Sequence, residues 1–362
     1  MARPKKTDKV VEPEVKDKKG PKLSHAEIKA ATVAKILEEY SCMVSAPKDR
    51  TDNLFKLQIP SLNAILGGGL PRGQMIHLYG AQGAGKSTLA QQIIQSVQAA
   101  GGNVLLVDAE NTMHSPYMKA IGIDCSPEKL TLIDKITTAE DVLDMIEKMV
   151  RADGYSLVVV DTVAALLPAS ILESSNSDAS IGVQARMMSM ALLKLNNAAV
   201  NSGTIILFVN QLRANISPMP NAPKSTTPGG NALKFYCNIE LRMSRVGSIT
   251  EGAKVIGQEV KIEVMKNKIA PPMRNTVCNL IYGEGFTRDS DLILAAKDAK
   301  IIDLAGSWFT YGTNKWQGLS AIKEYAKEHP EFLNELEAKL YGDQPVIVPE
   351  EAKSVKEEPV AD

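Results

Sequence analysis

The chain has 362 residues, of which 44% are apolar and 23% charged, and its formal net charge at pH 7 is -1. This is enough for one large domain with appendages or for two domains with a substantial core. No apolar run reaches the length of a membrane-spanning helix, and the near-zero net charge means that any nucleic acid would have to be held by local patches.

The beginning of the chain and its cysteines bear on the compartment. The N-terminus has no apolar segment of the kind found in secretory signals. Cys42, Cys125, Cys237 and Cys278 are far apart and form no C-x-x-C pair. We therefore expect a cytoplasmic protein with no membrane partner, whose cysteines are buried free thiols and not disulfides or zinc ligands.

Two N-terminal segments precede the first apolar strand. Residues 1–24 hold eight basic and four acidic side chains and few apolar ones, which predicts a disordered tail, either simply solvated or weakly attracted to nucleic acid. Residues 24–40 have the apolar spacing of a short amphipathic helix, which would pack on its own domain or on a neighbouring subunit. We treat 25–49 as this helix and its linker.

A phosphate-binding loop is the strongest motif in the chain. The residues that fit G-x-x-x-x-G-K-[ST] are Gly80-Ala81-Gln82-Gly83-Ala84-Gly85-Lys86-Ser87. A plain glycine-rich turn is the alternative, but an apolar strand precedes the loop and a helical pattern follows it, as a true P-loop requires. Lys86 is placed to reach the β- and γ-phosphates of a nucleoside triphosphate, and Ser87 to hold Mg²⁺.

Apolar runs then alternate with helical patterns. The expected strands are 75–79, 103–107, 130–133, 157–160 and 204–209. The expected helices are 87–100, 116–121, 140–149 and 182–200, with a capping box at 137–140 for the third. The fold class predicted by this alternation is α/β, a P-loop NTPase core with a mostly parallel sheet covered by helices.

Polar residues end three of these strands, where a parallel sheet would gather them. Asp161 ends an apolar run in the Walker B pattern and would coordinate Mg²⁺. Glu110 stands just past its strand and could activate water, and Gln211 stands where a γ-phosphate sensor would lie. A single acid or amide at a strand end often only caps the next turn, whereas the three in order after a P-loop indicate an ATPase.

Two polar segments follow these strand ends. One covers 173–182, and the other, 213–229, contains four prolines and is expected to be irregular. Two such loops beside an ATP site suggest that the nucleotide controls binding of something extended. Neither loop is strongly basic, so backbone N–H groups and hydroxyls would share the contacts with Arg186, Arg213 and Lys224.

The sequence pattern changes after residue 235, where the helical stretches between the apolar runs are replaced by short turns. Runs at 235–244, 259–266 and 275–282 predict an antiparallel extension of the sheet. Residues 288–342 indicate a small α/β C-terminal domain that ends in one or two helices over 320–341. The last twenty residues carry six acids and two lysines, which predicts a disordered acidic tail over 343–362.

Seven segments in a fixed order, several without a general ATPase meaning, carry a resemblance to a known family. They are Val-Asp-Ala-Glu at 107–110, Asn-Gln-Leu-Arg at 210–213, Lys-Asn-Lys-Ile-Ala at 266–270, and the segments 159–166, 185–189, 229–236 and 282–285. With these segments the chain resembles the RecA family of homologous-recombination ATPases, of the bacterial or bacteriophage kind, from about 24 to about 341.

The resemblance implies a helical filament on single-stranded DNA that pairs it with homologous duplex, exchanges strands, and acts in DNA repair and the SOS response. ATP with Mg²⁺ would lie between adjacent subunits, with Glu110, Lys86, Gln211, Lys266 and Lys268 as catalytic residues. The implied nucleotide contacts are Gly80, Gln82, Gly83, Ala84, Gly85, Lys86, Ser87, Thr88, Tyr117 (on adenine) and Asp161, the last with Ser87 on the metal.

The remaining implied roles concern DNA and the neighbouring subunit. The 25–49 helix would dock on a neighbour, Phe235 would pack at the subunit interface, and 50–287 would form the ATPase core. The 288–342 domain would help to capture duplex DNA. The implied DNA contacts are Arg186, Arg213, Lys224, Gly229, Gly230 and Asn231. Lys266 and Lys268 would reach a neighbour's nucleotide, and their i, i+2 spacing on a strand would put both on one face.

The chain also departs from the family. The P-loop interior differs, and Ser87 replaces the commoner Thr. His114 stands where the family often has Asp near adenine, and Glu240 stands where it often has Arg. The second DNA loop is rich in proline and lacks the family's usual Phe, so its contacts would differ.

Three other functions compete with a recombinase. A hexameric DNA helicase with the same core would not need the 229–235 segment or the C-terminal domain. A mediator that scarcely hydrolyses ATP is disfavoured by intact Glu110 and Gln211. A small-molecule kinase would need an acceptor pocket and a lid, and the sequence shows neither. Single-strand-binding and loader proteins are left open as partners.

Overall fold

The computed structural model describes residues 32–35, 38, 53–173, 182–214, 225–226 and 231–342. By its internal contacts the chain forms two units, residues 1–49 and 50–362. In the first unit the described residues are helical and lie inside the helix expected for 24–40. The expected tails, 1–24 and 343–362, lie outside the described residues.

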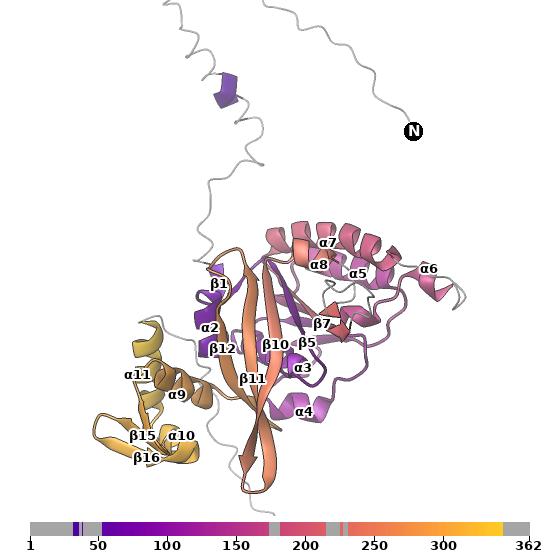
Figure 1. Cartoon of the computed structure of the whole chain (residues 1–362). Helices are drawn as coiled ribbons and strands as arrows, with labels where there is room; N and C mark the ends of the chain where they lie inside the picture. The colour runs from indigo at the N-terminus through magenta and orange to yellow at the C-terminus, as the bar shows by residue number, and fades with distance from the viewer. Residues whose placement is uncertain are drawn as a thin grey trace, which may run out of the picture. The chain divides into compact units, whose positions relative to one another are not determined.

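A nine-stranded sheet is the centre of the second unit (Figure 1). Its strand order is β13-β12-β11-β10-β3-β7-β6-β4-β5, and every neighbouring pair from β10 to β5 is parallel. Its parallel strands are β3 (Met75–Gly80), β4 (Val104–Asp108), β5 (Leu130–Ile133), β6 (Leu157–Asp161), β7 (Ile205–Gln211) and β10 (Ile239–Glu251). The predicted mostly parallel α/β core is confirmed.

Helices cover both faces of the sheet's parallel half. α3 (Lys86–Ala99) and α4 (Ser115–Ala120) lie on one face, and α5 (Ala139–Arg151) and α7 (Val183–Ser202) on the other, as Figure 1 shows. In α5, the buried Val142, Ile146 and Val150 recur every fourth residue, which places one apolar stripe against the sheet. The strands between the two helical layers are apolar on both sides, so they read as continuous hydrophobic runs.

The start of α5 differs from the expected capping box by one residue. Thr138 is the N-cap, and its hydroxyl accepts a hydrogen bond from the backbone N–H of Asp141 at 3.1 Å. The N-cap is therefore Thr138 and not Thr137. The reason is that Thr137 and Thr138 both offer a hydroxyl, and the buried stripe of the helix selects Thr138 as the cap.

The antiparallel extension is present, but it begins later than predicted. Phe235 and Tyr236 belong to the short helix α8 (Ala232–Tyr236), and β10 starts at Ile239. β10 and β11 (Lys254–Asn267) form a long hairpin that Figure 1 shows projecting from the sheet. β12 (Asn275–Ile281) and β13 (Gly285–Phe286) complete it.

The end of the chain has a core of its own, made of ten buried residues between Leu292 and Leu336. Its elements are α9 (Arg288–Asp298), β14 (Asp303–Ala305), β15 (Trp308–Tyr311), β16 (Asn314–Gln317), α10 (Gly318–Glu328) and α11 (Pro330–Tyr341). The buried carboxylate of Asp291 accepts hydrogen bonds from the backbone N–H and hydroxyl of Ser61 at 2.7 and 2.5 Å. This contact ties α9 to α2 (Pro60–Leu66).

Small elements complete the described chain. They are β1 (Leu54–Phe55), β2 (Leu70–Pro71), the 3-10 helix η3 (Val163–Ala165), α6 (Ala169–Leu172), β8 (Arg213–Ala214) and β9 (Ser225–Thr226). Cys237 and Cys278 are buried free thiols, whereas Cys125 is half-buried and Cys42 lies outside the described residues. In the described ranges, no helix is both long and apolar enough to cross a membrane.

Candidate active site

The P-loop connects β3 to α3 at the carboxyl edge of the sheet, and two of its glycines are required by geometry. Gly85 has a φ of +86°, and a Cβ there would lie 2.6 Å from the Leu280 side chain. A Cβ on Gly80 would lie 2.3 Å from the carbonyl oxygen of Met243. Both contacts come from strands far along the chain, so the loop fits only because these positions lack side chains.

Lys86 lies under this loop and is only 7% exposed. Its Nζ donates a hydrogen bond to the carbonyl of Ala81 at 2.8 Å. Burial lowers the pKa of Lys86, while the carboxylates of Asp161 and Glu110 act in the opposite direction. The ammonium group is therefore held beside two acids and within the anion-binding loop, where a phosphate would be its natural counter-ion.

Asp161 ends β6 beside the loop and is buried. Burial raises its pKa to about 6, and a hydrogen bond with Ser87 opposes the shift. Its Oδ2 atom is buried without a hydrogen-bond partner. No cluster of three or more His, Cys, Asp or Glu side chains suited to a metal occurs in the part of the chain that the structure describes. One unpartnered carboxylate oxygen and one hydroxyl fit Mg²⁺, which takes few protein ligands and binds the rest through phosphates and water.

Glu110 and Gln211 are directly linked. The Gln211 amide donates hydrogen bonds to both carboxylate oxygens of Glu110, at 3.0 and 3.4 Å. The hydroxyl of Thr162 donates to the same carboxylate at 3.0 Å. The three residues come from the ends of β7, β4 and β6, which lie side by side in the sheet. The carboxyl edge of the sheet thus joins Glu110 to Gln211, with Asp161 at the end of the intervening β6.

A cavity of about 700 Å³ lies over these groups. Of the expected nucleotide contacts, Gly80 and Ala84 do not line it. Those that do are Gln82, Gly83, Gly85, Lys86, Ser87, Thr88, Tyr117 and Asp161, together with Glu110 and Gln211. The size and the mixture of polar groups with one half-buried aromatic ring suit a nucleotide.

Several residues that line the cavity were not anticipated. They are Gln91, Thr112, Met113, Thr162, Arg245, Gln258, Leu280, Tyr282 and Gly283. Gln258 on β11 is 4% exposed, and its amide donates a hydrogen bond to the carbonyl of Gly83 at 3.0 Å. No short motif marks Arg245, Gln258 and Leu280, because β10 to β12 reach the loop only after the sheet has formed. Thr162 follows Asp161 within the 159–166 segment of the resemblance. Tyr282 and Gly283 lie within the 282–285 segment of the resemblance, which was their one available signal.

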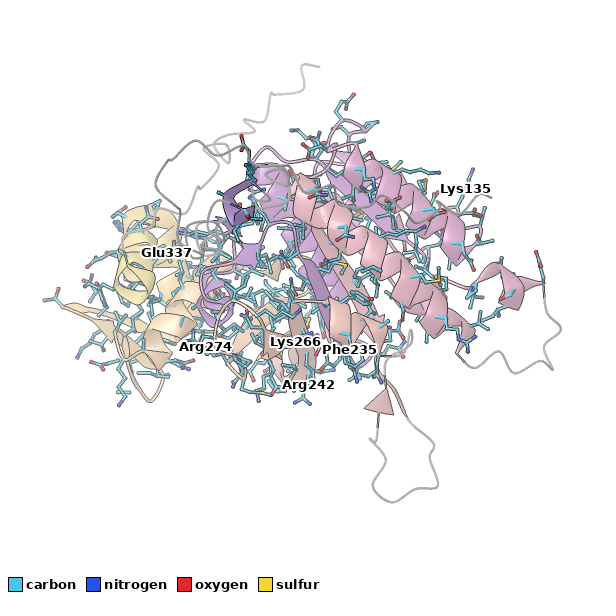
Figure 2. The ribbon with its side chains drawn as sticks, turned by 90° about the horizontal axis from the view of Figure 1, so that it is seen from above. Lys135, Phe235, Arg242, Lys266, Arg274 and Glu337 are labelled. Carbon is cyan, nitrogen blue, oxygen red and sulfur yellow. The ribbon has the colours of Figure 1, made fainter. Side chains whose placement is uncertain are left out.

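Lys266, Lys268 and Phe235 do not line this cavity. Figure 2 shows Lys266 beside Phe235, and its Nζ donates hydrogen bonds to the carbonyls of Lys234 and Phe235 at the end of α8. Phe235 is 73% exposed, so it is not a core residue. β11 ends at Asn267, so Lys268 lies past the strand. The prediction that both lysines lie on one strand, with its pleating placing them on one face, is therefore wrong.

The expected DNA contacts are only partly described. Arg186 is exposed in the first turn of α7, and Asn231 is the exposed N-cap of α8. Arg213 lies in β8, which pairs with β9, so the 213–229 segment contains a short ribbon that its prolines did not predict. Lys224, Gly229 and Gly230, and residues 174–181 of the other loop, lie outside the described residues.

Comparison with known proteins gives consistent results. A family model of the RecA N-terminal domain matches residues 47–287, and one of the RecA C-terminal domain matches 290–343. Protein RecA of Geobacter metallireducens is 40% identical over 283 residues, 78% of this chain and 82% of the relative. Protein RecA of Bordetella petrii is 38% identical over 288 residues, 79% of this chain and 80% of the relative.

A third relative and a solved structure extend the comparison. Protein RecA of Dichelobacter nodosus is 37% identical over 282 residues, 77% of this chain and 79% of the relative. The crystal structure of the RadB recombinase aligns at 20% identity with a TM-score of 0.47, over 63% of this chain and 96% of that chain. That likeness is too slight to add to the family matches.

Proposed function

The chain belongs to the RecA family, and from that premise we propose how its nucleotide site controls DNA. It is a DNA-dependent ATPase of homologous recombination and repair that binds ATP with Mg²⁺. It binds single- and double-stranded DNA and assembles with itself into a filament. The helicase and mediator alternatives are not favoured, since RecA proteins match over about four-fifths of both chains. We place its work in the cytoplasm, where its DNA is.

The residues of the cavity divide the work of hydrolysis. Lys86 and the P-loop N–H groups hold the β- and γ-phosphates, and Ser87 and Asp161 hold the metal. When bound, Mg²⁺ neutralises the negative charge that develops on the phosphate oxygens. Glu110 orients the attacking water and accepts its proton, with Thr162 fixing the position of the carboxylate at 3.0 Å.

The hydrogen bond between Gln211 and Glu110 is the observation that carries the proposal. Gln211 is the last residue of β7, and the 213–229 segment begins two residues later. The backbone N–H of Leu212 also donates to the carbonyl of Gly80 in the P-loop at 3.1 Å. A γ-phosphate that draws the Gln211 amide away from Glu110 would free the carboxylate for water and shift the start of the DNA-binding segment in one step.

The exposed side of α8 serves the neighbouring subunit. Lys266 and Lys268 lie away from this chain's own cavity, and Phe235 offers a large apolar ring to solvent beside Lys266. We assign both lysines to the γ-phosphate of a neighbour's ATP and Phe235 to the subunit contact. The N-terminal 25–49 segment docks on the same neighbour or the opposite one.

The other assignments follow the family by position. Arg186, Arg213 and Lys224, with Gly229, Gly230 and Asn231, contact single-stranded DNA from within or directly beside the 173–182 and 213–229 loops. The ATPase core is 50–287, and the 288–342 domain helps to capture duplex DNA. The basic tail 1–24 and the acidic tail 343–362 lie outside the described residues.

Two measurements test the function. ATP turnover should rise strongly when single-stranded DNA is added, and no stimulation by any DNA would refute the proposal. Electron microscopy with single-stranded DNA and a slowly hydrolysed ATP analogue should show helical filaments. Closed rings would favour the helicase.

A further inference from the structure

A buried acid–histidine pair lies on the strands that carry the P-loop and Lys266. Glu240 of β10 is 9% exposed, and its Oε1 lies 3.5 Å from Nδ1 of His77 on β3. In the sheet, Glu240 is the direct partner of His77 on one side and of Lys266 on the other. Side chains of directly paired residues share one face of a sheet and lie within contact range, so the three form a row across β3, β10 and β11.

The row is held rigidly at the His77 end. His77 is fully buried, and its ring stacks on that of Tyr79 with 4.9 Å between centroids. Its Nε2 atom has no hydrogen-bond partner, so the Glu240 carboxylate is the polar neighbour of this imidazole. The stacked ring cannot turn freely, and it therefore limits where the carboxylate can lie.

The other end of the row is Lys266. Some of the neighbours of its ammonium group favour the charged form and others disfavour it. It donates to the carbonyls of Lys234 and Phe235 at the C-terminal end of α8. Burial lowers the pKa of Lys266 and so does the nearby Lys268, while Glu240 and the thiol of Cys237 act in the opposite direction. Glu240 is thus the carboxylate that favours the charged form of Lys266.

We propose that Glu240, fixed by His77, is a positioning residue for Lys266 that keeps its ammonium group charged and oriented toward the neighbouring subunit's ATP. This inference rests on the proposed role of Lys266 at the subunit contact. Tyr79 and Arg242 also face Glu240, and neither hydrogen-bonds to it among the described contacts.

The link has a mechanical consequence as well as an electrostatic one. His77 stands three residues before Gly80, the first residue of the P-loop, on the same strand. A displacement of β3 during nucleotide binding would move His77 and with it the carboxylate beside Lys266. The row therefore joins this subunit's phosphate loop to the lysine that serves the next subunit's phosphate.

The test compares Glu240→Gln, which removes the charge and keeps the shape, with Glu240→Asp, which keeps the charge. Glu259→Gln is the matched control, an exposed acid on β11 distant from Lys266. The first readout is the rate at which acetic anhydride labels Lys266, followed by mass spectrometry from pH 7 to 10. Only the neutral amine reacts, so labelling reports the charge of Lys266 without requiring DNA or turnover.

In Glu240→Gln, Lys266 should be labelled several-fold faster near pH 8.5, and Glu240→Asp should restore slow labelling. The alkaline limb of DNA-stimulated kcat should move to lower pH with little change in the KM for ATP, while kcat at pH 6.5 stays close to that of the unmodified chain. Glu259→Gln should change neither readout.

Unchanged labelling in Glu240→Gln overturns the inference, as does an equal loss of kcat at every pH, which indicates a merely structural role. Changed labelling with an unchanged pH–rate profile also overturns it, because the link would then not serve turnover. Lys266→Ala is measured in parallel. If that variant keeps normal DNA-stimulated turnover, the proposed role of Lys266 fails, and the inference with it. If it loses turnover while Glu240→Gln behaves as the unmodified chain, only the inference fails.

Discussion

The two halves of the nine-stranded sheet differ in how they are covered. Around β3, β7, β6 and β4 both faces are buried by helices, and the strands are buried and mainly apolar. In β10 and β11 one face joins the core, whereas the other carries Arg242, Lys261 and Glu263, which pair with one another at 2.7 to 2.9 Å. The buried apolar residues on the face covered by α5 and α7 form one cluster. Within the described part of the chain, this cluster takes no residue from β10, β11 or β12.

This difference separates two tasks. The doubly covered half excludes water and fixes Lys86, Asp161, Glu110 and Gln211 at its carboxyl edge, so that most of one nucleotide site is built within one chain. The half that is open on one face presents polar residues, and the exposed Phe235 at the end of α8 lies beside Lys266 of this half, which suits contact with another subunit. Substitutions in the covered half should therefore act within a single chain, whereas substitutions in the open half should act mainly in the assembled filament.

The largest expected effect is in the covered half. Glu110→Gln should slow DNA-stimulated ATP turnover by about 100- to 1000-fold, because the amide cannot accept a proton from water. Binding of ATP and of DNA should persist, since the hydrogen-bond partners of Glu110 are Thr162 and Gln211 and the phosphates are held by Lys86 and the P-loop N–H groups. Single-turnover hydrolysis beside a nucleotide-binding assay measures both, with the exposed Glu128→Gln as control. An unchanged rate would remove Glu110 from its role.

Asp161→Asn tests the same half through stability. Because burial raises the pKa of Asp161 to about 6 from 3.8, its charge destabilises the metal-free fold by about 3 kcal/mol at neutral pH. The penalty is complete above pH 6 and disappears below pH 3.8, where the carboxyl is protonated in the folded and unfolded states. Asp161→Asn should therefore raise the free energy of unfolding at pH 7.5 by up to that amount.

Denaturant unfolding in EDTA at pH 7.5 and pH 4 checks this expectation, with the exposed Asp134→Asn as control. Equal stabilities of the variant and the unmodified chain at pH 7.5 would contradict it. Mg²⁺-dependent turnover should be lost in Asp161→Asn, because its oxygen is the carboxylate ligand available beside Ser87.

Lys266→Ala tests the open half. It should lower DNA-stimulated turnover by about 10- to 100-fold, since a charge aimed at the transition state is lost from the neighbour's site. ATP affinity of the unassembled protein should be unchanged, because Lys266 does not line its own chain's cavity. The exposed Lys254→Ala, on the same strand, is the control. A loss of ATP affinity in the dispersed protein would place Lys266 in its own chain's site instead.

Phe235→Ala should have the smallest effect on the folded subunit. At 73% exposure, its truncation should change the free energy of unfolding by less than about 0.5 kcal/mol, whereas truncating the buried Phe208 should cost about 3 to 5 kcal/mol. Filament assembly, followed by light scattering on single-stranded DNA, should require a higher protein concentration. Normal assembly of Phe235→Ala would show that the ring does not contribute to the subunit contact.

Much of the covered half could be predicted from the sequence. The strand ends near Glu110, Asp161 and Gln211 could be predicted because parallel strands place their carboxyl ends on one edge, whatever the exact register. The open half was harder to predict. The strand predicted to start at 235 included the end of α8, and Lys266 and Lys268 do not share a strand because β11 stops at Asn267.

Gln258 and Arg245 could not be identified beforehand for a physical reason. Their positions beside the P-loop depend on the register of β10 against β3 and of β11 against β10, including three register shifts in the long hairpin. A shift of one residue turns every side chain to the other face of the sheet. No local pattern in the sequence reports such shifts.

The sequence by itself determined the fold class, the phosphate loop and the polar strand ends, because these follow from local chain geometry and from the periodicity of buried side chains. Only the tertiary structure decided that Gln211 bonds to Glu110, that Phe235 faces solvent, and that Glu240 stands between His77 and Lys266. The contacts of Gln211 and Glu240 join segments separated by 26 to 163 residues, which meet only when the sheet assembles.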